Sequence, residues 1–418
     1  MALNKKQRLV GVWLVVTYVL LVCWFSVRSA EDPGSHFFQP EKGYQPRYSL
    51  TRIEEALRFL ATFNLSATVP AHNNKNGSAV SENIDMCAGI VTVKRPMQQN
   101  LDTTVGSILD GLSRDQWSSL ELQVLFAQTN LTDHPDYGQP WVANLVDHVL
   151  TYDQLNASID TLRHFEQEKN VQGKSLIDYR LSLEACYYKT DAKWFLMLED
   201  DVVAQKKWYG QTMQSLRKAK EWQEKGKIHD WLYLRLFYTE KFLGWNSEEW
   251  PIYLAASLLT ISAVGGMGLF ARRKFRPMHE VISNRFLAVV CLVYMPLIIV
   301  LYFLAGRVTV RPMNPGVHVM NRNGCCSQAM LFPREKAPLL IDHLRKTGES
   351  NLMAVDSAIE VLADQTGLDR LAMSPSQMQH VGAASYKEKK KSWDWEGPHP
   401  VQGAHGVWSV GFESAYEA

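Results

Sequence analysis

The sequence predicts an α/β domain with a mainly parallel central sheet, divided by two apolar helices and preceded by a third. Three observations support this prediction. Short apolar segments alternate with amphipathic ones, three segments are uncharged over 19 to 21 residues, and one apolar strand ends in three consecutive carboxylates. Alternating strands and helices are typical of a parallel sheet covered by helices. The 418 residues suffice for two or three average domains, and a formal net charge of +1 does not indicate a polyanion-binding protein.

Three segments are long enough and apolar enough to cross a membrane. They are residues 9–27, 252–271 and 286–306, and none contains a charged side chain. At about 1.5 Å rise per residue, each matches a hydrocarbon core of about 30 Å. We therefore predict three membrane spans, with Pro296 tolerated as a kink inside the third. Because the spans carry no charge, we do not expect a transporter or a channel.

Basic residues flank these segments on the side predicted to face the cytosol. Lys5, Lys6 and Arg8 precede the first span, and residues 272–285 carry five Lys or Arg side chains against one acid. The positive-inside rule therefore places residues 1–8 and 272–285 in the cytosol, and residues 28–251 and 307–418 in a lumen. The first span is too long for the apolar core of a cleaved signal peptide, so we predict an uncleaved signal-anchor.

Two residue types support a lumenal location for the large segments. Four N-glycosylation sequons precede the second span, at Asn64, Asn76, Asn130 and Asn156. Four of the six cysteines lie in the same lumenal segments, where disulfides can form: Cys87, Cys186, Cys325 and Cys326. These four cysteines allow three pairings, and the sequence does not choose among them.

Residues 28–251 show helical and strand patterns in turn. A stalk and a first helix occupy residues 28–85, with the helix at 51–63 and a polar loop at 73–83. From residue 86 we predict a strand at 87–96, a helix at 101–112, strands at 120–130 and 147–155, a helix at 173–190 and a strand at 192–200. Open α/β sheets bind ligands at the carboxyl ends of their strands.

The segment after the third span holds too few strands for a core of its own. One or two strands within 316–335 precede helices at 335–347 and 351–367, and an apolar stretch with a polar turn covers 368–385. We therefore expect residues 307–385 to complete the sheet begun by residues 86–251, with a membrane hairpin between them and a tail at 386–418. The ends of a hairpin lie close together, which makes such an insertion tolerable.

The stretch FLMLEDDVV places charge at the end of a predicted strand. Trp194 to Leu198 are mostly apolar, and Glu199, Asp200 and Asp201 follow directly. Three adjacent carboxylates repel one another and are costly to desolvate, so removing one should relieve repulsion in the metal-free protein. A cation with a polyphosphate would explain the triplet. A solvated acidic turn is the simpler explanation of the triplet taken alone.

Together with SPSQMQHVGAAS near the end of the chain, LEDDVV resembles the donor site of a GT-A glycosyltransferase. The signal-anchor and the hairpin with its basic loop resemble, more closely, the Golgi GPI-anchor side-chain N-acetylgalactosamine transferases. The likeness covers the chain up to Ser385, and the hairpin is its most specific element. The more widespread motif is Asp-x-Asp, whereas the first acid here is Glu199, a form that the closer family tolerates.

The resemblance implies a multi-pass Golgi membrane enzyme with a lumenal catalytic domain. Its reaction would be transfer of N-acetylgalactosamine from UDP-GalNAc to a mannose of the GPI-anchor glycan on GPI-anchored proteins, with inversion at the transferred sugar. Mn²⁺ or Mg²⁺ would offset the charge of the departing diphosphate. By resemblance, Asp201 is the direct metal ligand, Glu199 faces the ribose or base, and Asp200 faces the donor's sugar or ribose.

Five further residues each have a functional and a structural interpretation. His380 matches a distal histidine that often completes the metal site in this fold, or it is a histidine of a surface turn. Lys94 and Arg95 either hold the uridine or phosphates or are solvated at a strand end. Asp178 and Tyr179 either line the donor pocket or cap and pack their helix.

Asp356 is the candidate base that deprotonates the acceptor hydroxyl, as an inverting transfer requires. It is also placed to be the N-cap of the helix SAIEVLADQ, since Asp is a preferred cap. Glu360, one helical turn further on, is the substitute base.

Other functions remain open. A transferase of the same fold could use UDP-galactose or UDP-N-acetylglucosamine, on GPI or on N-glycans, and a non-catalytic relative could act as a membrane scaffold. The intact triplet and His380 favour an enzyme over a scaffold. The sequence does not identify the residues that would distinguish galactose from N-acetylgalactosamine.

Overall fold

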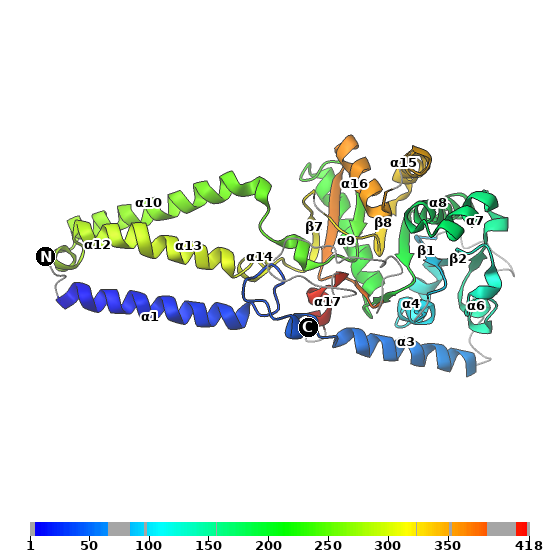
Figure 1. Cartoon of the computed structure of the whole chain (residues 1–418), viewed down its shortest axis with the longest axis horizontal. Helices are drawn as coiled ribbons and strands as arrows, with labels where there is room; N and C mark the ends of the chain where they lie inside the picture. Colours follow the sequence, from blue (N-terminus) through cyan, green and yellow to red (C-terminus); the bar gives the residue numbers. More distant parts are fainter. Residues whose placement is uncertain are drawn as a thin grey trace. The chain divides into compact units, whose positions relative to one another are not determined.

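The structure is a computed structural model, and it describes residues 5–65, 84–95, 98–155, 157–322, 324–350, 353–382 and 407–415. These residues form two compact units (Figure 1). An apolar helical unit comprises the described parts of residues 1–45 and 240–313. An α/β unit comprises the described parts of 46–239, 314–393 and 401–418.

The helical unit contains three helices that are long and apolar enough to cross a membrane. The predicted spans match α1 (Lys5–Arg28), α10 (Trp250–Lys274), and the stretch from α12 (Asn284–Val289) to α13 (Met295–Leu304). A π-helical turn, Val290–Tyr294, joins α12 to α13 and directly precedes Met295 and Pro296. A wider turn accommodates the proline ring, which would otherwise clash with an earlier carbonyl, so the helix continues past Pro296.

The N-terminal end of α1 lies beside the segment that joins α10 to α12. Gln7 Nε2 donates to the Val281 carbonyl (3.1 Å) and to Ser283 Oγ (3.0 Å). Gln7 belongs to the basic segment before the first span, and Val281 ends α11 (Arg276–Val281) in the basic segment 272–285. The two segments predicted to face the same side of a membrane therefore lie at the same end of this unit.

The α/β unit is built on a mixed, mostly parallel sheet of eight described strands in the order β3-β2-β1-β4-β8-β6-β9-β7. Only β7 and β8 run against the other six. The strands are β1 (Met86–Thr92), β2 (Leu120–Phe126), β3 (His148–Leu150), β4 (Trp194–Glu199), β6 (Trp231–Arg235), β7 (Gly316–Val319), β8 (Ala329–Pro333) and β9 (Asp369–Ser374). β6, from before residue 240, lies between β8 and β9, which follow residue 313, so both segments build one sheet.

Helices cover both faces of the sheet, because alternate strand residues point to opposite sides. Met86, Ala88 and Ile90 share one core with α3 (Tyr48–Leu65), α4 (Leu101–Leu109), α6 (Pro140–Leu145) and α9 (Trp208–Glu224). Cys87 faces the other core, with α8 (Val171–Lys189), α15 (Ala337–Ser350) and α16 (Val355–Thr366). Figure 1 shows these last three helices along the same side of the unit. The buried disulfide Cys87–Cys186 ties β1 to α8.

Several elements differ from the sequence predictions. The strand predicted at 147–155 is only the three residues of β3, followed by a short 3₁₀ turn at Tyr152–Gln154. The strand β6 and the helices α5 (Arg114–Ser119), α7 (Ile159–Glu168), α9 and α17 (Val410–Ser414) lie outside the predictions. In α9 only a few large apolar side chains face the core, which weakens the amphipathic pattern that would reveal it.

Candidate active site

The acidic triplet lies at the carboxyl end of β4, next to a two-stranded ribbon. In that ribbon β5 (Val202–Ala204) pairs antiparallel with β10 (Met378–His380), and Val202 is opposite His380. The Val381 amide also donates to the Asp201 carbonyl (2.8 Å). This pairing brings together Asp201 and His380, which are far apart in the sequence.

Asp201 and His380 form a buried pair. The distance between His380 Nε2 and Asp201 Oδ2 is 3.1 Å, and the two residues are 9% and 2% exposed, respectively. A Cβ atom on Gly382 would lie 2.4 Å from Asp201 Oδ2 and 2.9 Å from His380 Nε2. Real Cβ atoms essentially never lie so close to another atom, so any larger residue at position 382 would displace the pair or the backbone.

Each member of the pair has a buried polar atom without a hydrogen-bond partner among the described residues: Asp201 Oδ1 and His380 Nδ1. Leaving such atoms unpaired costs about 1–3 kcal/mol each. Native structures tolerate this mainly where a ligand, an ion or water completes the site. The unpaired atoms therefore mark this pair as a candidate ligand site.

Arg95 holds the acidic triplet together from the end of β1. Its Nη1 lies 2.9 Å from Asp201 Oδ2, its Nε donates to Asp200 Oδ1 (3.0 Å), and its Nη2 contacts the same Asp200 oxygen. Burial would lower the pKa of Arg95, but the charges of Asp200 and Asp201 raise it. Arg95 is thus an ion-pair partner of the triplet, while the neighbouring Lys94 is exposed. We call Arg95, Asp200, Asp201 and His380 the Asp201 cluster.

The two aspartates differ in their acidity. Burial, opposed by Arg95 and reinforced by the charge of Asp201, raises the pKa of Asp200. Burial would also raise the pKa of Asp201, but His380 and Arg95 lower it to about 2. For His380 burial favours the neutral ring, yet Asp201 raises its pKa above the ordinary value. Asp201 and His380 therefore stabilise each other as an ion pair.

A neutral histidine that the sequence analysis did not identify supports Asp200. His134 Nδ1 accepts the Asp136 amide (3.2 Å), so the ring proton is on Nε2 and donates to Thr92 Oγ1 (2.9 Å). Thr92 in turn donates to Asp200 Oδ2 (2.7 Å). Burial lowers the pKa of His134 to about 4, which keeps the ring neutral at pH 7. A lone histidine in a loop carries no sequence signal for this role.

Asp136 adds a second unpaired oxygen near the triplet. Its Oδ2 is buried without a hydrogen-bond partner among the described residues. Burial, followed by the charges of Asp102 and Asp200, raises the pKa of Asp136 to about 6.

Glu199 is positioned by the segment that leads into β8. Ser327 Oγ donates to Glu199 Oε1 (2.8 Å), and Ser327 follows Cys325 and Cys326, which are bonded to each other. The sequence left the pairing of these four cysteines open, and the structure shows the disulfides Cys87–Cys186 and Cys325–Cys326. Arg235 Nη1 donates to the carbonyls of both Cys325 and Cys326.

Glu360, the substitute base of the sequence analysis, lies in a second buried cluster. Its carboxylate accepts from Tyr233 Oη (2.5 Å), Arg235 Nη2 (2.6 Å) and Arg370 Nε (2.6 Å). With both oxygens engaged, Glu360 is occupied as a structural counter-ion. We call Tyr233, Arg235, Glu360 and Arg370 the Glu360 cluster.

Asp356 lies in the first turn of α16, where its Oδ1 accepts the Ser357 amide (2.8 Å). The helix begins at Val355 with Ala354 as N-cap, so the interpretation of Asp356 as the N-cap is wrong. Because α16 leads directly into β9, its last turn lies near the start of that strand. Its first turn lies about 18 Å from the last turn along the helix axis.

Asp178 and Tyr179 are packed within the α8 side of the core. Asp178 accepts from Tyr152 Oη (2.6 Å) and Lys174 Nζ (2.8 Å), and burial raises its pKa. The Tyr179 hydroxyl is buried without a described partner, and burial followed by the charge of Glu199 raises its pKa. Asp178 therefore fits its structural interpretation, whereas Tyr179 lies close enough to Glu199 for their charges to interact.

The sequons differ in what the structure describes. Asn130 is exposed, at the start of a short 3₁₀ turn. Asn64 lies in α3, but its side chain is outside the described set, and Asn76 and Asn156 lie outside the described residues.

The Asp201 cluster supplies two potential metal ligands. Within the described parts of the chain, no three His, Cys, Asp or Glu side chains converge as a metal site. A cation held by Asp201 and His380 would need its remaining ligands from a bound donor or from water. The unpaired Asp201 Oδ1 and the space left by Gly382 are compatible with this arrangement.

Residues 86–379 of the chain match the family model of GPI-N-acetylgalactosamine transferase PGAP4, and the chain belongs to this family. No curated protein shows a significant match to the chain. The matched segment includes the acidic triplet and ends one residue before His380.

Proposed function

We propose that this member of the GPI-N-acetylgalactosamine transferase family transfers N-acetylgalactosamine from UDP-GalNAc to a mannose of the GPI-anchor glycan. The observation that supports it best is the buried Asp201–His380 pair with its two unpaired atoms. The pair lies at the carboxyl end of a parallel strand, where α/β sheets bind their ligands.

Asp201 and His380, the latter after losing its ring proton, would hold a divalent cation, Mn²⁺ or Mg²⁺, which would offset the negative charge of the departing diphosphate. The chain's own residues prepare this site. Arg95 keeps both aspartates in place, and the hydrogen bonds from His134 to Thr92 and from Thr92 to Asp200 fix the Asp200 carboxylate. Ser327 holds the Glu199 carboxylate, which would face the ribose or base of the donor.

Asp356 is the proposed base for the acceptor hydroxyl. It is favoured over Glu360 because the Glu360 carboxylate is engaged by two arginines and a tyrosine. Asp356→Asn should lower kcat for transfer by about 10²–10⁴-fold and leave donor affinity unchanged. Normal transfer by Asp356→Asn would exclude it as the base.

The donor assignment is tested with purified full-length protein, a panel of UDP-sugars and Mn²⁺, measuring UDP release. We expect UDP-GalNAc to be hydrolysed fastest. Hydrolysis of UDP-GalNAc no faster than that of UDP-glucose would refute the donor assignment. A preference for UDP-galactose or UDP-N-acetylglucosamine would point to a related transferase, and no hydrolysis of any donor would point to a scaffold.

The Golgi location and the topology are part of the proposal. The chain would span the membrane three times, with residues 1–8 and 272–285 in the cytosol and the α/β unit in the lumen. An epitope near Pro277 should stain after the plasma membrane alone is permeabilised, and Asn130 should carry a glycan. Staining only after Golgi membranes are opened would refute this topology.

A further inference from the structure

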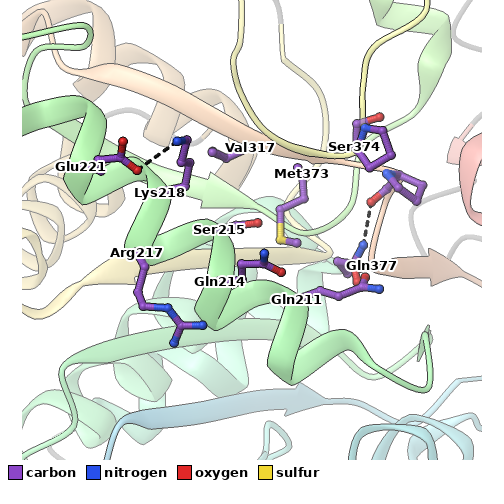
Figure 2. Close-up of a pocket in the computed structure, with 13 residues that line it drawn as sticks. Gln211, Gln214, Ser215, Arg217, Lys218, Glu221, Val317, Met373, Ser374 and Gln377 are labelled. Carbon is purple, nitrogen blue, oxygen red and sulfur yellow. Dashed lines mark hydrogen bonds and ion pairs between the residues drawn. The ribbon is translucent and has the colours of Figure 1, made fainter. Parts of the chain in front are cut away.

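A groove of about 640 Å³ lies in the α/β unit between α9 and the strands β7 and β9. Figure 2 shows Gln211, Gln214, Lys218 and Glu221 along one side of it, facing Met373, Ser374 and Gln377. Its volume falls within the range of about 300–1,000 Å³ that is typical of small-ligand pockets. None of the residues placed in the Asp201 or Glu360 clusters lines it.

The helix α9 presents two different stripes. Its buried stripe includes Trp208, Thr212, Leu216 and Ala219, which pack into the core. Its second stripe, at residues 211, 214, 215, 218 and 221, has helical spacing and lines the groove, yet it contains no large apolar residue. A helix stripe that faces strands through polar side chains leaves those side chains available to a polar ligand.

The lining suits a neutral saccharide. Sugar rings combine apolar C–H faces with hydroxyl groups that both donate and accept hydrogen bonds. A glutamine amide can both donate and accept hydrogen bonds. The lining contains three such amides, on Gln211, Gln214 and Gln377. Proline, valine and methionine side chains supply the apolar part: Pro315, Val317, Met373 and Pro375.

Charge and burial agree with this ligand class. Lys218 forms an ion pair with Glu221 (2.9 Å). The charged residues of the lining are Arg217, Lys218 and Glu221, with a net charge of +1. Such a lining gives no strong preference for a polyanion. Gln377 is 1% exposed and anchored through Nε2 to the Pro375 carbonyl (2.8 Å), while its Oε1 has no described partner.

The groove and the candidate active site are neighbours along the chain. Gln377 immediately precedes β10, which carries His380, so the two residues lie within about 10 Å along the backbone. In the sheet, β9 is three strands from β4, or about 14 Å away. Arg95 and Thr92, which support the triplet, follow or end β1 on the other side of β4.

We propose that this groove binds the acceptor glycan as an oligosaccharide that extends from the Asp201 cluster to the edge strand β7. The inference rests on the proposed function, because it assigns the acceptor of that reaction to this surface. The amide side chains of Gln211, Gln214 and Gln377 bind sugar hydroxyls, and they determine acceptor affinity without contacting the donor.

The test uses the full-length protein in detergent, UDP-GalNAc, Mn²⁺ and a synthetic GPI core glycan. The variants are Gln211→Ala combined with Gln214→Ala, and separately Gln377→Met, which keeps the side-chain volume. Gln223→Ala, on the same helix but outside the groove, is the matched control. We expect the double variant to raise the acceptor KM about tenfold and Gln377→Met to raise it a few fold. UDP-GalNAc hydrolysis without acceptor, and the Gln223→Ala variant, should stay within twofold of wild type.

An unchanged acceptor KM in both groove variants would overturn the inference, as would an equal loss of donor hydrolysis. Binding of the same glycan without donor, followed by saturation-transfer NMR, separates this outcome from failure of the proposed function. If the wild type transfers no sugar but binds the glycan, and the double variant loses that binding, the groove assignment holds while the reaction is wrong. Transfer by the wild type with unaltered glycan binding in the double variant would leave the reaction intact and refute the groove.

Discussion

The Asp201 cluster and the Glu360 cluster are both buried groups of arginine and carboxylate in the same α/β unit, yet their polar atoms are satisfied differently. Both oxygens of Glu360 accept hydrogen bonds, from Tyr233, Arg235 and Arg370. Asp201 Oδ1 and His380 Nδ1 have no described partner, and a Cβ atom on Gly382 would collide with Asp201 Oδ2 and His380 Nε2. Charge and burial are therefore alike in the two clusters, whereas the unpaired atoms of the carboxylate and its partner ring mark the Asp201 cluster as the candidate site.

The two clusters also differ in the free-energy cost of their unpaired buried polar atoms. Buried ion pairs gain little stability unless every polar atom is matched. The Glu360 cluster comes close to this condition, with one unmatched atom, Arg235 Nε. The Asp201 cluster departs further from it, as expected where a ligand completes the site.

Asp201→Ala is the largest expected change. Without its charge the site loses the proposed cation, so transfer should fall about 10³-fold or more. Because its folded pKa of about 2 lies below the ordinary value of 3.8, the ionised Asp201 stabilises the fold at pH 7. This contribution is present above pH 4 and is lost between about pH 4 and pH 2.

The measurements for Asp201→Ala are GalNAc transfer to GPI and the free energy of unfolding. Asp160→Ala, on an exposed carboxylate, is the matched control. The sequence alone predicts relief of repulsion and a more stable variant, while the ion pair with His380 predicts a less stable one. Near-normal transfer by Asp201→Ala would show that the triplet is only an acidic turn and not a metal site.

Glu360→Ala should act on stability instead of on chemistry. It leaves Arg235, which is 1% exposed, without its carboxylate, and breaking a buried pair in this way costs about 3–5 kcal/mol. We expect a lower unfolding temperature and, for the folded fraction, a kcat within a few fold of wild type. Glu335→Ala, on an exposed glutamate, is the control. Unchanged stability with a hundredfold lower kcat would make Glu360 the base after all.

Gly382→Ala probes the space beside the Asp201 cluster. The added Cβ would lie 2.4 Å from Asp201 Oδ2, so Asp201 or the backbone must shift. We expect about tenfold slower transfer and a stability loss of about 1–3 kcal/mol. Gly348→Ala, in α15 with nothing within 4 Å of the new Cβ, should have no such effect. Equal activity in the two variants would show that the close approach is not needed.

Asp136→Asn should give the smallest effect and the opposite sign. Burial raises the pKa of Asp136 from 3.8 to about 6, so its charged form is disfavoured in the fold and costs stability above pH 6. The neutral amide should therefore stabilise the protein by about 1–2 kcal/mol at pH 7.5, allowing for partial exposure. Thermal unfolding at pH 7.5 and pH 4 measures this, and the gain should disappear at pH 4. A gain that is the same at both values would contradict the assigned titration.

The contrast between the clusters also separates what could be predicted from the sequence. Strand and helix periodicity, the three apolar segments and the position of the triplet after β4 all depend on residues close in the chain, so they could be read locally. The expectation that both segments around the apolar helices build one sheet also followed from their counts of strands, and the sheet order agrees with it.

The tertiary structure alone decided which charged residues meet. Arg95, predicted to hold the donor, contacts two aspartates, and Glu360, predicted as the substitute base, contacts two arginines. His134 and Gly382 gave no local signal, because their roles depend on contacts with Thr92 and Asp201 that only folding creates. Periodicity reports which face a residue takes, but it does not report which distant side chain arrives there. The proposed chemistry depends on which distant side chains meet at the carboxyl end of β4. Only the folded chain determines this, through the hydrogen bonds and ion pairs formed there.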